Sequence, residues 1–531
     1  MAHLHLDLAR SAAQTELAGH LAALRQEFSL PAGFPAEVLA EAERAAAARA
    51  DRLPASDRTD LPLLTIDPPG STDLDQAVHI RRGTEDTEDT EGAAGAAGSA
   101  GHPGPHDGFT VHYAIADVPA FIAPGGPLDA ETLRRGQTIY LPDGRVPLHP
   151  EVISEDTGSL LPGVDRGAYL WTFRLDADGA VVSTGLERAR VRSREQLTYE
   201  QAQQRIDRGE GGNGGETSAT LSLLREVGLL RAAQEIRRGG ASLRLPEQEV
   251  TATDRGYEVL SAPPLAVEDW NAQISLMTGI AAAETMLRGR IGILRTMPPA
   301  DADSEATFRA RTRALGHPWP ESQPYGEYLR GLDTADPRQL AVMHAATSLF
   351  RGAGYTAFDG DTPEVTVQAA IAAPYAHTTA PLRRLVDRFV LVTCLALVQG
   401  QPVPEGVRAL LPALPEAMRE SGLAASRASN AALELVEAAS LSGMEGHEFP
   451  AVVISAPSPE QAEKARTEGR LPWGEVQVGQ PPVLARYEGF AEAGSQIRVE
   501  LVTADLATRT VLFRVAGQQP PPEPVDWGHQ G

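Results

Sequence analysis

The spacing of apolar and polar positions changes along the chain, and each change indicates a different kind of secondary structure. Residues 12–28 and 35–52 carry apolar side chains at helical spacing, with Leu17, Leu21 and Leu24 on one face. From Leu61 onward, short alternating runs predict strands in the segments LPLLTID, AVHIRR, FTVHYAIADV, AYLWTFRLD and AVVSTGLERARVRS. Helical spacing returns near Gln201 and dominates from Glu268 to about Ser442, and alternating runs from His447 to Val515 predict a small β-barrel.

These patterns predict an α+β protein in three parts. Residues 1–58 form a helical domain, which we interpret as plain helix packing in preference to a helix-turn-helix. Residues 59–445 form a mixed central domain, residues 446–517 an S1/OB-like barrel and residues 518–531 a tail. Residues 83–108 contain a TED repeat and many small residues with almost nothing to bury, so we expect a disordered insertion in a hairpin.

Composition narrows the class of protein. The 531 residues exceed one ordinary core, and the net charge of −24 argues against a surface that is basic throughout, although it permits a local basic groove. One cysteine, Cys394, excludes a disulfide framework and a cysteine-rich zinc site. The amino terminus lacks a signal pattern and the longest apolar run, from Phe389 to Val398, is too short to span a bilayer, so we expect a cytoplasmic protein that does not enter membranes. We also expect a monomer.

Three carboxylates around a Pro-Pro-Gly turn are the strongest candidates for chemistry. Asp67 ends a predicted strand, and Asp73 and Asp75 follow the turn two residues apart, so an extended backbone would place both on one side. Carboxylates gathered this closely raise one another's pKa unless a cation neutralises them. Hard oxygen ligands favour Mg²⁺ or Mn²⁺. The alternative is an ordinary acidic turn whose Asp side chains cap backbone N–H groups.

The wider context of these carboxylates resembles one family, the RNase II/RNB exoribonucleases. That family has Ile-Asp, a short loop and then Asp-x-Asp-Asp-Ala, and this chain has Ile66-Asp67 followed by DLDQA over residues 73–77. The likeness covers roughly residues 58 to 445 in order. Its further segments are YAIADV (113–118), TIYLP (138–142), VPLHP (146–150), Ser159-Leu160, LTY (197–199), GASL (240–243), FRGAGY (350–355) and YAHTTAPLRRLVD (375–387).

The resemblance implies an RNB-type domain that hydrolyses RNA from its 3′ end to nucleoside 5′-monophosphates, with single-stranded RNA as the partner. It assigns the metal ion to Asp67, Asp73, Asp75 and Gln76. Arg383 would meet charge that develops on the phosphate, so Asp67, Asp73, Asp75 and Arg383 are the expected catalytic residues. The expected RNA-binding residues are Tyr140, Tyr199, Leu245, Tyr375 and Arg384.

Three positions depart from the family pattern. Gln76 stands where the family has a fourth Asp, so one negative charge is lost at the metal and the preferred ion can shift toward Mn²⁺. Leu245 replaces an aromatic that would stack on a base. Ile274 aligns with a glutamate that favours ribose, which predicts weak discrimination against DNA.

Arginines suggest where RNA could lie. Arg188, Arg190, Arg192 and Arg194 alternate on a predicted strand, which would place four guanidiniums on one face as a phosphate track or as a solvated face. Only a short helical stretch precedes Leu61, so no cold-shock barrels fit there, and we expect an entrance that tolerates structured RNA upstream of a 3′ tail. Two other functions stay open at this point: an RNA-binding protein that has lost catalysis through Gln76, and an unrelated metal-dependent phosphoesterase.

Overall fold

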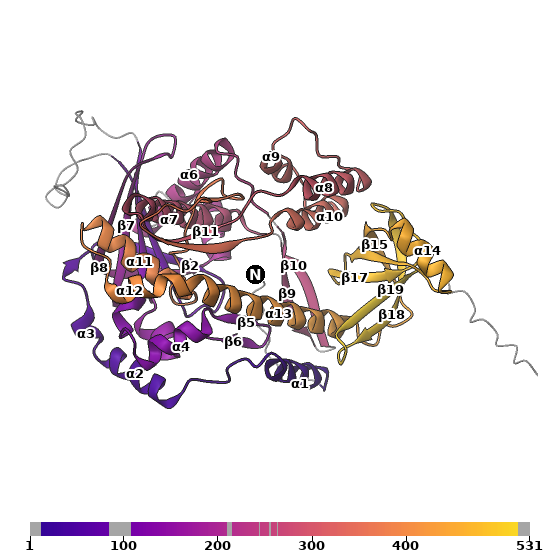
Figure 1. The fold of residues 1–531 in the computed structure, drawn as a ribbon, viewed down its shortest axis with the longest axis horizontal. Helices are drawn as coiled ribbons and strands as arrows, with labels where there is room; N and C mark the ends of the chain where they lie inside the picture. Colours follow the sequence, from indigo (N-terminus) through magenta and orange to yellow (C-terminus); the bar gives the residue numbers. More distant parts are fainter. Residues whose placement is uncertain are drawn as a thin grey trace, which may run out of the picture.

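The computed structural model describes residues 12–83, 108–209, 215–243, 245–253, 256–262 and 264–518. A large α+β body carries a small barrel at one end, and the long helix α13 (Leu414–Leu441) runs across the body toward the barrel (Figure 1). Within the described residues, no helix is both long and apolar enough to cross a membrane.

A mixed six-stranded sheet forms the centre of the body. Its strand order is β1-β8-β2-β3-β4-β7, and β7 pairs a second time with β8, so the sheet curls back on itself. β2 runs parallel to β8, whereas β3, β4 and β7 follow one another antiparallel. The strands are β1 (Ser56–Asp57), β2 (Leu63–Asp67), β3 (Gln76–Arg82), β4 (Phe109–Ala116), β7 (Asp165–Leu175) and β8 (Val181–Thr198). The strands predicted from alternation in this region are thus confirmed.

Alternate side chains of the sheet bury into two different cores, as the period of a strand requires. On β2, Leu64 and Ile66 enter the larger core, whereas Leu63 enters the smaller one. The larger core is covered by α5 (Tyr199–Asp207), α6 (Glu216–Arg237), α7 (Ala266–Gly289) and α11 (Leu385–Val398). The smaller core is covered by α2 (Ala36–Ala47), the 3-10 turn η1 (Val118–Phe121) and α4 (Pro127–Arg135).

Hairpins and short helices surround this body. Two-stranded sheets pair β5 (Ile139–Leu141) with β6 (Gly144–Val146), β9 (Glu247–Thr253) with β10 (Gly256–Ala262), β11 (Ile291–Thr296) with β12 (Gly354–Asp359), and β13 (Val367–Gln368) with β14 (Ala373–Pro374). The remaining helices of the body are α3 (Arg49–Arg52), η2 (Val152–Thr157), α8 (Ala302–Ala314), α9 (Tyr325–Arg330), α10 (Pro337–Ala346), η4 (Thr347–Leu349), α12 (Glu405–Leu410) and η5 (Leu411–Ala413).

The amino-terminal helices share their cores with the rest of the chain. Leu17, Leu21 and Leu24 of α1 (Ala12–Glu27) pack with α13 and with β5 and β6. Val38 of α2 belongs to the smaller core of the sheet. The two helices therefore pack on different parts of the body.

The expected insertion interrupts the hairpin of β3 and β4. Gly83 and Gly108 mark its base, where the Gly83 N–H donates to the Gly108 carbonyl at 2.8 Å. Residues 84–107, on which the prediction of disorder falls, lie outside the described residues.

The predicted carboxy-terminal barrel is confirmed as a closed five-stranded barrel in the order β15-β16-β17-β19-β18. Contacts with the body hold it in place: Val452 and Ile454 of β15 pack into the core of α8–α10, and Arg509 forms an ion pair with Glu27 of α1 at 2.9 Å. Its elements are β15 (Glu448–Ser455), α14 (Pro459–Thr467), β16 (Trp473–Val478), β17 (Val483–Glu488), β18 (Gln496–Asp505) and β19 (Thr510–Val515).

One prediction concerns a close approach between α7 and the segment after β14. A Cβ added at Gly279 would overlap the ring of Tyr375 and come within 2.7 Å of the Ala376 carbonyl oxygen. We expect Gly279→Ala to lower the free energy of unfolding by about 1–3 kcal/mol, because an overpacked contact must shift. Gly422→Ala on α13 is the matched control, since nothing lies within 4 Å of its added Cβ. Chemical denaturation of both variants checks this, and equal stabilities would contradict it.

A second prediction concerns His79 on β3, which stacks on His112 at 5.8 Å between ring centroids. Burial, with the charge of Arg81, lowers the pKa of His79 to about 4. The folded pKa lies below the unfolded value of about 6.5, so the neutral ring stabilises the fold above pH 6.5 and that contribution is lost as pH falls toward 4.

We expect His79→Asn to flatten the fall in the free energy of unfolding between pH 7 and pH 4.5, by at most about 3 kcal/mol and less after solvent screening. His447→Asn, at an exposed histidine, should keep the wild-type slope. Denaturant titrations at both pH values measure the slope, and an unchanged slope in His79→Asn would rule out this assignment.

Candidate active site

The carboxylate loop, residues 67–75, connects β2 to β3 and is fixed along its length. Ser159 holds it from beneath: its hydroxyl donates to the Thr72 carbonyl at 2.7 Å and accepts from the Leu74 N–H at 2.9 Å. Leu74 is fully buried, and the Asp75 carbonyl accepts from the Ala116 N–H at 3.0 Å. Gly70 has φ +76°, which allows the turn after Pro68 and Pro69. The loop therefore presents its carboxylates from a rigid base.

Asp75 is the most deeply buried of the three carboxylates, at 4% exposure. Its Oδ1 accepts the Leu382 N–H at 2.7 Å, and its Oδ2 lies 3.5 Å from the Arg383 Nε. Burial raises the pKa of Asp75 well above its ordinary value; Arg383 and the Leu382 N–H oppose the rise, and the charge of Asp73 adds to it. Asp75 and Arg383 lie some 300 positions apart in the sequence, and the fold brings them together as expected.

Asp67, at the end of β2, lies in the same electrostatic environment. Burial raises its pKa to about 7, with Arg383 lowering it and Asp73 raising it. Its Oδ2 is buried and has no hydrogen-bond partner among the described residues. A buried carboxylate oxygen without a partner is costly, so this atom calls for a proton or a cation.

The negative charge of Asp73, in contrast, is already balanced by an arginine of the protein. Its Oδ1 accepts from Arg145 of β6 at 2.7 Å, and its Oδ2 accepts from the Tyr140 hydroxyl of β5 at 3.1 Å. Arg145 also forms an ion pair with Glu155 of η2 and donates to the Thr72 hydroxyl at 2.9 Å. Arg145 therefore competes for the carboxylate that was expected to be a metal ligand.

The fit of a divalent cation rests on Asp67 and Asp75. Asp75 is buried and Asp67 is half-buried, both pKa values are raised, and the buried Oδ2 of Asp67 has no partner among the described residues. As the side chains stand in the described part of the chain, no three or more His, Cys, Asp or Glu residues form a metal-binding group. A cation held by Asp67 and Asp75 fits this donor set, and Asp73 joins it only by releasing Arg145.

Gln76 has its amide oxygen engaged elsewhere. Gln76 Oε1 accepts from the Tyr113 hydroxyl and, at 3.1 Å, from the Ser275 hydroxyl of α7. The hydroxyl oxygens of Tyr113 and Ser275 also lie 2.8 Å apart. An oxygen that already accepts two hydrogen bonds is poorly available to a metal ion, so the expected contribution of Gln76 is not made in this arrangement.

The expected RNA-binding tyrosines differ in their placement. Tyr140 is half-buried beside Asp73, as described above. Tyr199, the first residue of α5, has its pKa raised to about 12 by burial and by the charge of Asp67, so its hydroxyl lies near the carboxylates. Tyr375 is 9% exposed, with its ring packed on α7 at Gly279 and edge-on to His377 at 5.5 Å.

Three other expected positions lie in structural contacts. Arg384 donates two hydrogen bonds to Asp387, at 3.0 and 2.9 Å. Leu245 packs against the core of α8–α10. Ile274 is fully buried in the larger core of the sheet, and weak discrimination against DNA stays a prediction.

The sequence interpretation missed Arg145, although a signal for it was present. The short turn at Pro142-Asp143 pairs Tyr140 with Arg145 directly across β5 and β6. A hairpin register read with Pro142 and Asp143 as the two turn residues would have placed this arginine beside the tyrosine.

The expected phosphate track on β8 is occupied by protein groups. Arg188 donates to Asp117 at 2.5 Å, Arg190 to Asp57 at 2.5 Å and Arg192 to Asp165 at 2.7 Å. Arg194 donates to the Thr59 carbonyl at 2.7 Å. These arginines bond to other segments of the protein, an arrangement that neither the phosphate track nor the solvated face had predicted.

Comparisons with known proteins agree with this geometry. Human exosome complex exonuclease RRP44 is 27% identical over 342 residues, which cover 62% of this chain and 33% of that protein. The chain spans about a third of the length of the first curated relatives that it matches.

Solved structures share the fold. RNase R of Mycoplasma genitalium, in complex with ribose-methylated single-stranded RNA, matches with a TM-score of 0.79 and 16% identity over 94% of this chain and 78% of that chain. Yeast Ssd1, described as a pseudonuclease, matches with a TM-score of 0.62 and 17% identity over 85% of this chain and 54% of that chain. The same fold thus occurs in a nuclease and in a protein described as inactive.

Family models match both folded parts of the chain. Residues 447–516 match the RNase II-type exonuclease C-terminal S1 domain. Residues 56–399 match the RNB domain, which removes the alternative of an unrelated phosphoesterase. Because that match covers more than half of the sequence, the chain belongs to the RNB domain family.

Proposed function

We propose that the chain is a divalent-metal-dependent exoribonuclease that hydrolyses single-stranded RNA from its 3′ end to nucleoside 5′-monophosphates, with Mg²⁺ or Mn²⁺ as the ion. The observation that carries the proposal is the pair of carboxylates, Asp67 and Asp75, that share Arg383 within an RNB domain. Nucleases of this family generally use a divalent metal, and carboxylate oxygens are the ligands that Mg²⁺ and Mn²⁺ prefer.

In this proposal water attacks the phosphorus, the bond from phosphorus to the 3′ oxygen breaks, and the shortened RNA keeps a 3′ hydroxyl. The bound ion would supply Lewis-acid activation of water and charge stabilisation at the leaving oxygen. Arg383, 3.5 Å from Asp75, is placed to donate its guanidinium N–H groups to the phosphate oxygens as negative charge develops.

The neighbouring residues position these groups. The Leu382 N–H fixes one oxygen of Asp75 and thereby directs the other toward Arg383. Arg145 and Tyr140 hold Asp73 in place. Tyr140 and Tyr199 offer aromatic surfaces beside the carboxylates, and stacking on aromatic rings accepts every base.

A second function, RNA binding without cleavage, is favoured by one observation. The oxygen of Gln76 is engaged by Tyr113 and Ser275, so the site has lost one charge and one ligand of the family pattern. In that case RNA would occupy the same site and no phosphodiester bond would break.

Cleavage of 5′-labelled single-stranded RNA separates the two functions. With Mg²⁺ or Mn²⁺ we expect a ladder that shortens from the 3′ end, and loss of at least about 100-fold in rate in Asp75→Asn, because electrostatic contacts to a reacting phosphate are worth that much. Asp361→Asn, at a fully exposed carboxylate, is the control that should cleave normally.

RNA binding without cleavage by the wild-type protein would support the second function, and the absence of both would refute the two together. A partial duplex with a 3′ tail in the same gel tests the expected tolerance of structured RNA. A stall several nucleotides before every duplex would contradict that expectation.

Restoring the missing carboxylate is a separate test of the metal site. We expect Gln76→Asp to lower the metal concentration for half-maximal cleavage by roughly 10-fold or more, the range that outer contacts of metal sites control. The asparagine of Gln76→Asn has the same side-chain length as aspartate but no charge, so this variant should not lower the metal concentration. An unchanged metal requirement in Gln76→Asp would show that position 76 does not act on the ion.

A further inference from the structure

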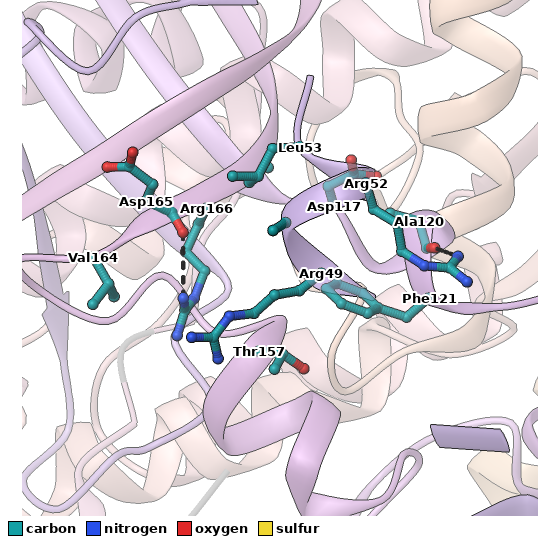
Figure 2. A pocket seen from close by; sticks show the side chains of 12 residues that line it. Arg49, Arg52, Leu53, Asp117, Ala120, Phe121, Thr157, Val164, Asp165 and Arg166 are labelled. Atoms are coloured by element: carbon teal, nitrogen blue, oxygen red, sulfur yellow. Dashed lines mark hydrogen bonds between the residues drawn. The ribbon is translucent and has the colours of Figure 1, made fainter. Parts of the chain in front are cut away.

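A cavity of about 210 Å³ is lined by Thr157 of η2 and by none of residues 67–75 of the carboxylate loop (Figure 2). Glu155 of η2 accepts from Thr72 of the carboxylate loop at 2.9 Å, whereas Thr157, two residues later, lines the cavity. The other walls come from α3, the segment after β4 and the start of β7. The cavity is therefore separate from the candidate active site.

Two arginines of this cavity have no carboxylate partner in the described part of the chain. Arg49 makes no hydrogen bond or ion pair there, and Arg52 donates only to the Ala120 carbonyl. Figure 2 shows the guanidinium of Arg49 reaching toward that of Arg166. The two cations are close enough for Arg49 to lower the pKa of Arg166. Two like charges held together favour an anion between them.

Arg166 is 6% exposed and has one donor to spare. Its Nε donates to the Ser159 carbonyl at 2.9 Å, and one terminal nitrogen donates to the Asp156 carbonyl at 2.9 Å and forms an ion pair with the Asp156 carboxylate at 3.3 Å. The other terminal nitrogen donates to the Asp165 carbonyl at 3.3 Å. A guanidinium has five N–H donors, so one N–H of that last nitrogen has no partner.

The carboxylates that line the cavity are neutralised from outside it. Asp165 pairs with Arg192 at 2.6 Å, and Asp117 pairs with Arg188 at 2.5 Å. The second oxygen of Asp117 is different: the residue is 2% exposed, and Oδ1 has no hydrogen-bond partner among the described residues. The cavity thus combines two exposed arginines that have no carboxylate partner among the described residues, one spare N–H of Arg166, and one buried acceptor that requires a donor.

We propose that this cavity binds the phosphate end of a phosphomonoester, the chemical class to which nucleoside 5′-monophosphates belong. The phosphate lies between Arg49 and Arg166, and a hydroxyl of the same molecule donates to Asp117 Oδ1. A volume of 210 Å³ corresponds to roughly seven waters at about 30 Å³ each, which exceeds a bare anion and falls below drug-sized pockets. Arginine is suited to phosphate because its donors match two oxygens at once.

Ser159 connects this cavity to the carboxylate loop. Arg166 holds the Ser159 carbonyl, and the Ser159 hydroxyl holds Thr72 and Leu74 on either side of Asp73. A ligand that accepts a hydrogen bond from Arg166 therefore affects Ser159, which is hydrogen-bonded to the loop.

Calorimetric titration of the full-length protein without RNA and with a chelator present tests the site. The probes are adenosine 5′-monophosphate, inorganic phosphate and adenosine. We expect the nucleotide to bind the wild-type protein, adenosine not to bind, and Arg49→Gln to weaken nucleotide binding at least about tenfold, a loss of about 1.4 kcal/mol.

Two variants serve as controls. Arg44→Gln removes an exposed arginine of α2 outside the cavity and should bind the nucleotide as the wild type does, whereas Arg383→Gln reports any nucleotide that binds in the candidate active site. Equal binding by Arg49→Gln and the wild type would overturn the proposal, as would binding of adenosine as tight as that of the nucleotide.

If inorganic phosphate binds and the nucleotide does not, the site is one for a bare anion, and the assignment to a phosphomonoester is overturned. A loss in Arg383→Gln with retention in Arg49→Gln would place the nucleotide in the active site and refute the cavity. Because no cleavage is measured, the result is independent of the proposed exoribonuclease activity.

Discussion

The carboxylate of Asp75 is held by the backbone N–H of Leu382 on one oxygen and faces Arg383 with the other. This contact joins the loop after β2 to the segment before α11, about 300 residues later in the sequence, so the site exists only when the whole RNB domain is folded. Removing a carboxylate from water is costly, and here burial raises the pKa of Asp75 although an arginine lies beside it. An additional positive charge beside Asp75 would therefore lower the free-energy cost of keeping this carboxylate ionised.

Charge in this protein is balanced locally, and the net charge of −24 says little about where RNA binds. Arg188, Arg190 and Arg192 on β8 neutralise carboxylates of neighbouring segments, and Arg145 neutralises Asp73. The arginines without carboxylate partners are more informative than the clusters seen in the sequence, because only unpaired donors can receive a phosphate without losing an existing ion pair. By this criterion Arg49 and Arg52 differ from the arginines of β8.

The sequence predicted those features that depend on local periodicity. The strands around Asp67 and Asp75 and the closed barrel all follow from alternation, and the motifs placed Asp67, Asp73, Asp75 and Arg383 together. Features that depend on long-range packing were not predictable in this way. Arg145 reaches Asp73 across a hairpin, α1 packs on a helix some 400 residues away, and Ile274 turned out to lie in the core.

Gln76 shows how a single substitution can be accommodated by rearranged hydrogen bonds. A carboxylate at the start of β3 would face the hydroxyls of Tyr113 and Ser275, which can donate to an amide oxygen equally well. The amide therefore satisfies its neighbours without requiring a cation, whereas Asp67 Oδ2 is buried and finds no partner in the part of the chain that the structure describes. A bound cation would therefore be stabilised mainly by Asp67 and Asp75, on the side of the loop that Arg383 also faces.

The loop that carries these residues is hydrogen-bonded to the Ser159 hydroxyl, and Arg166 donates to the Ser159 carbonyl. The rigidity of the active site and the chemistry of the cavity beside η2 consequently depend on the same guanidinium.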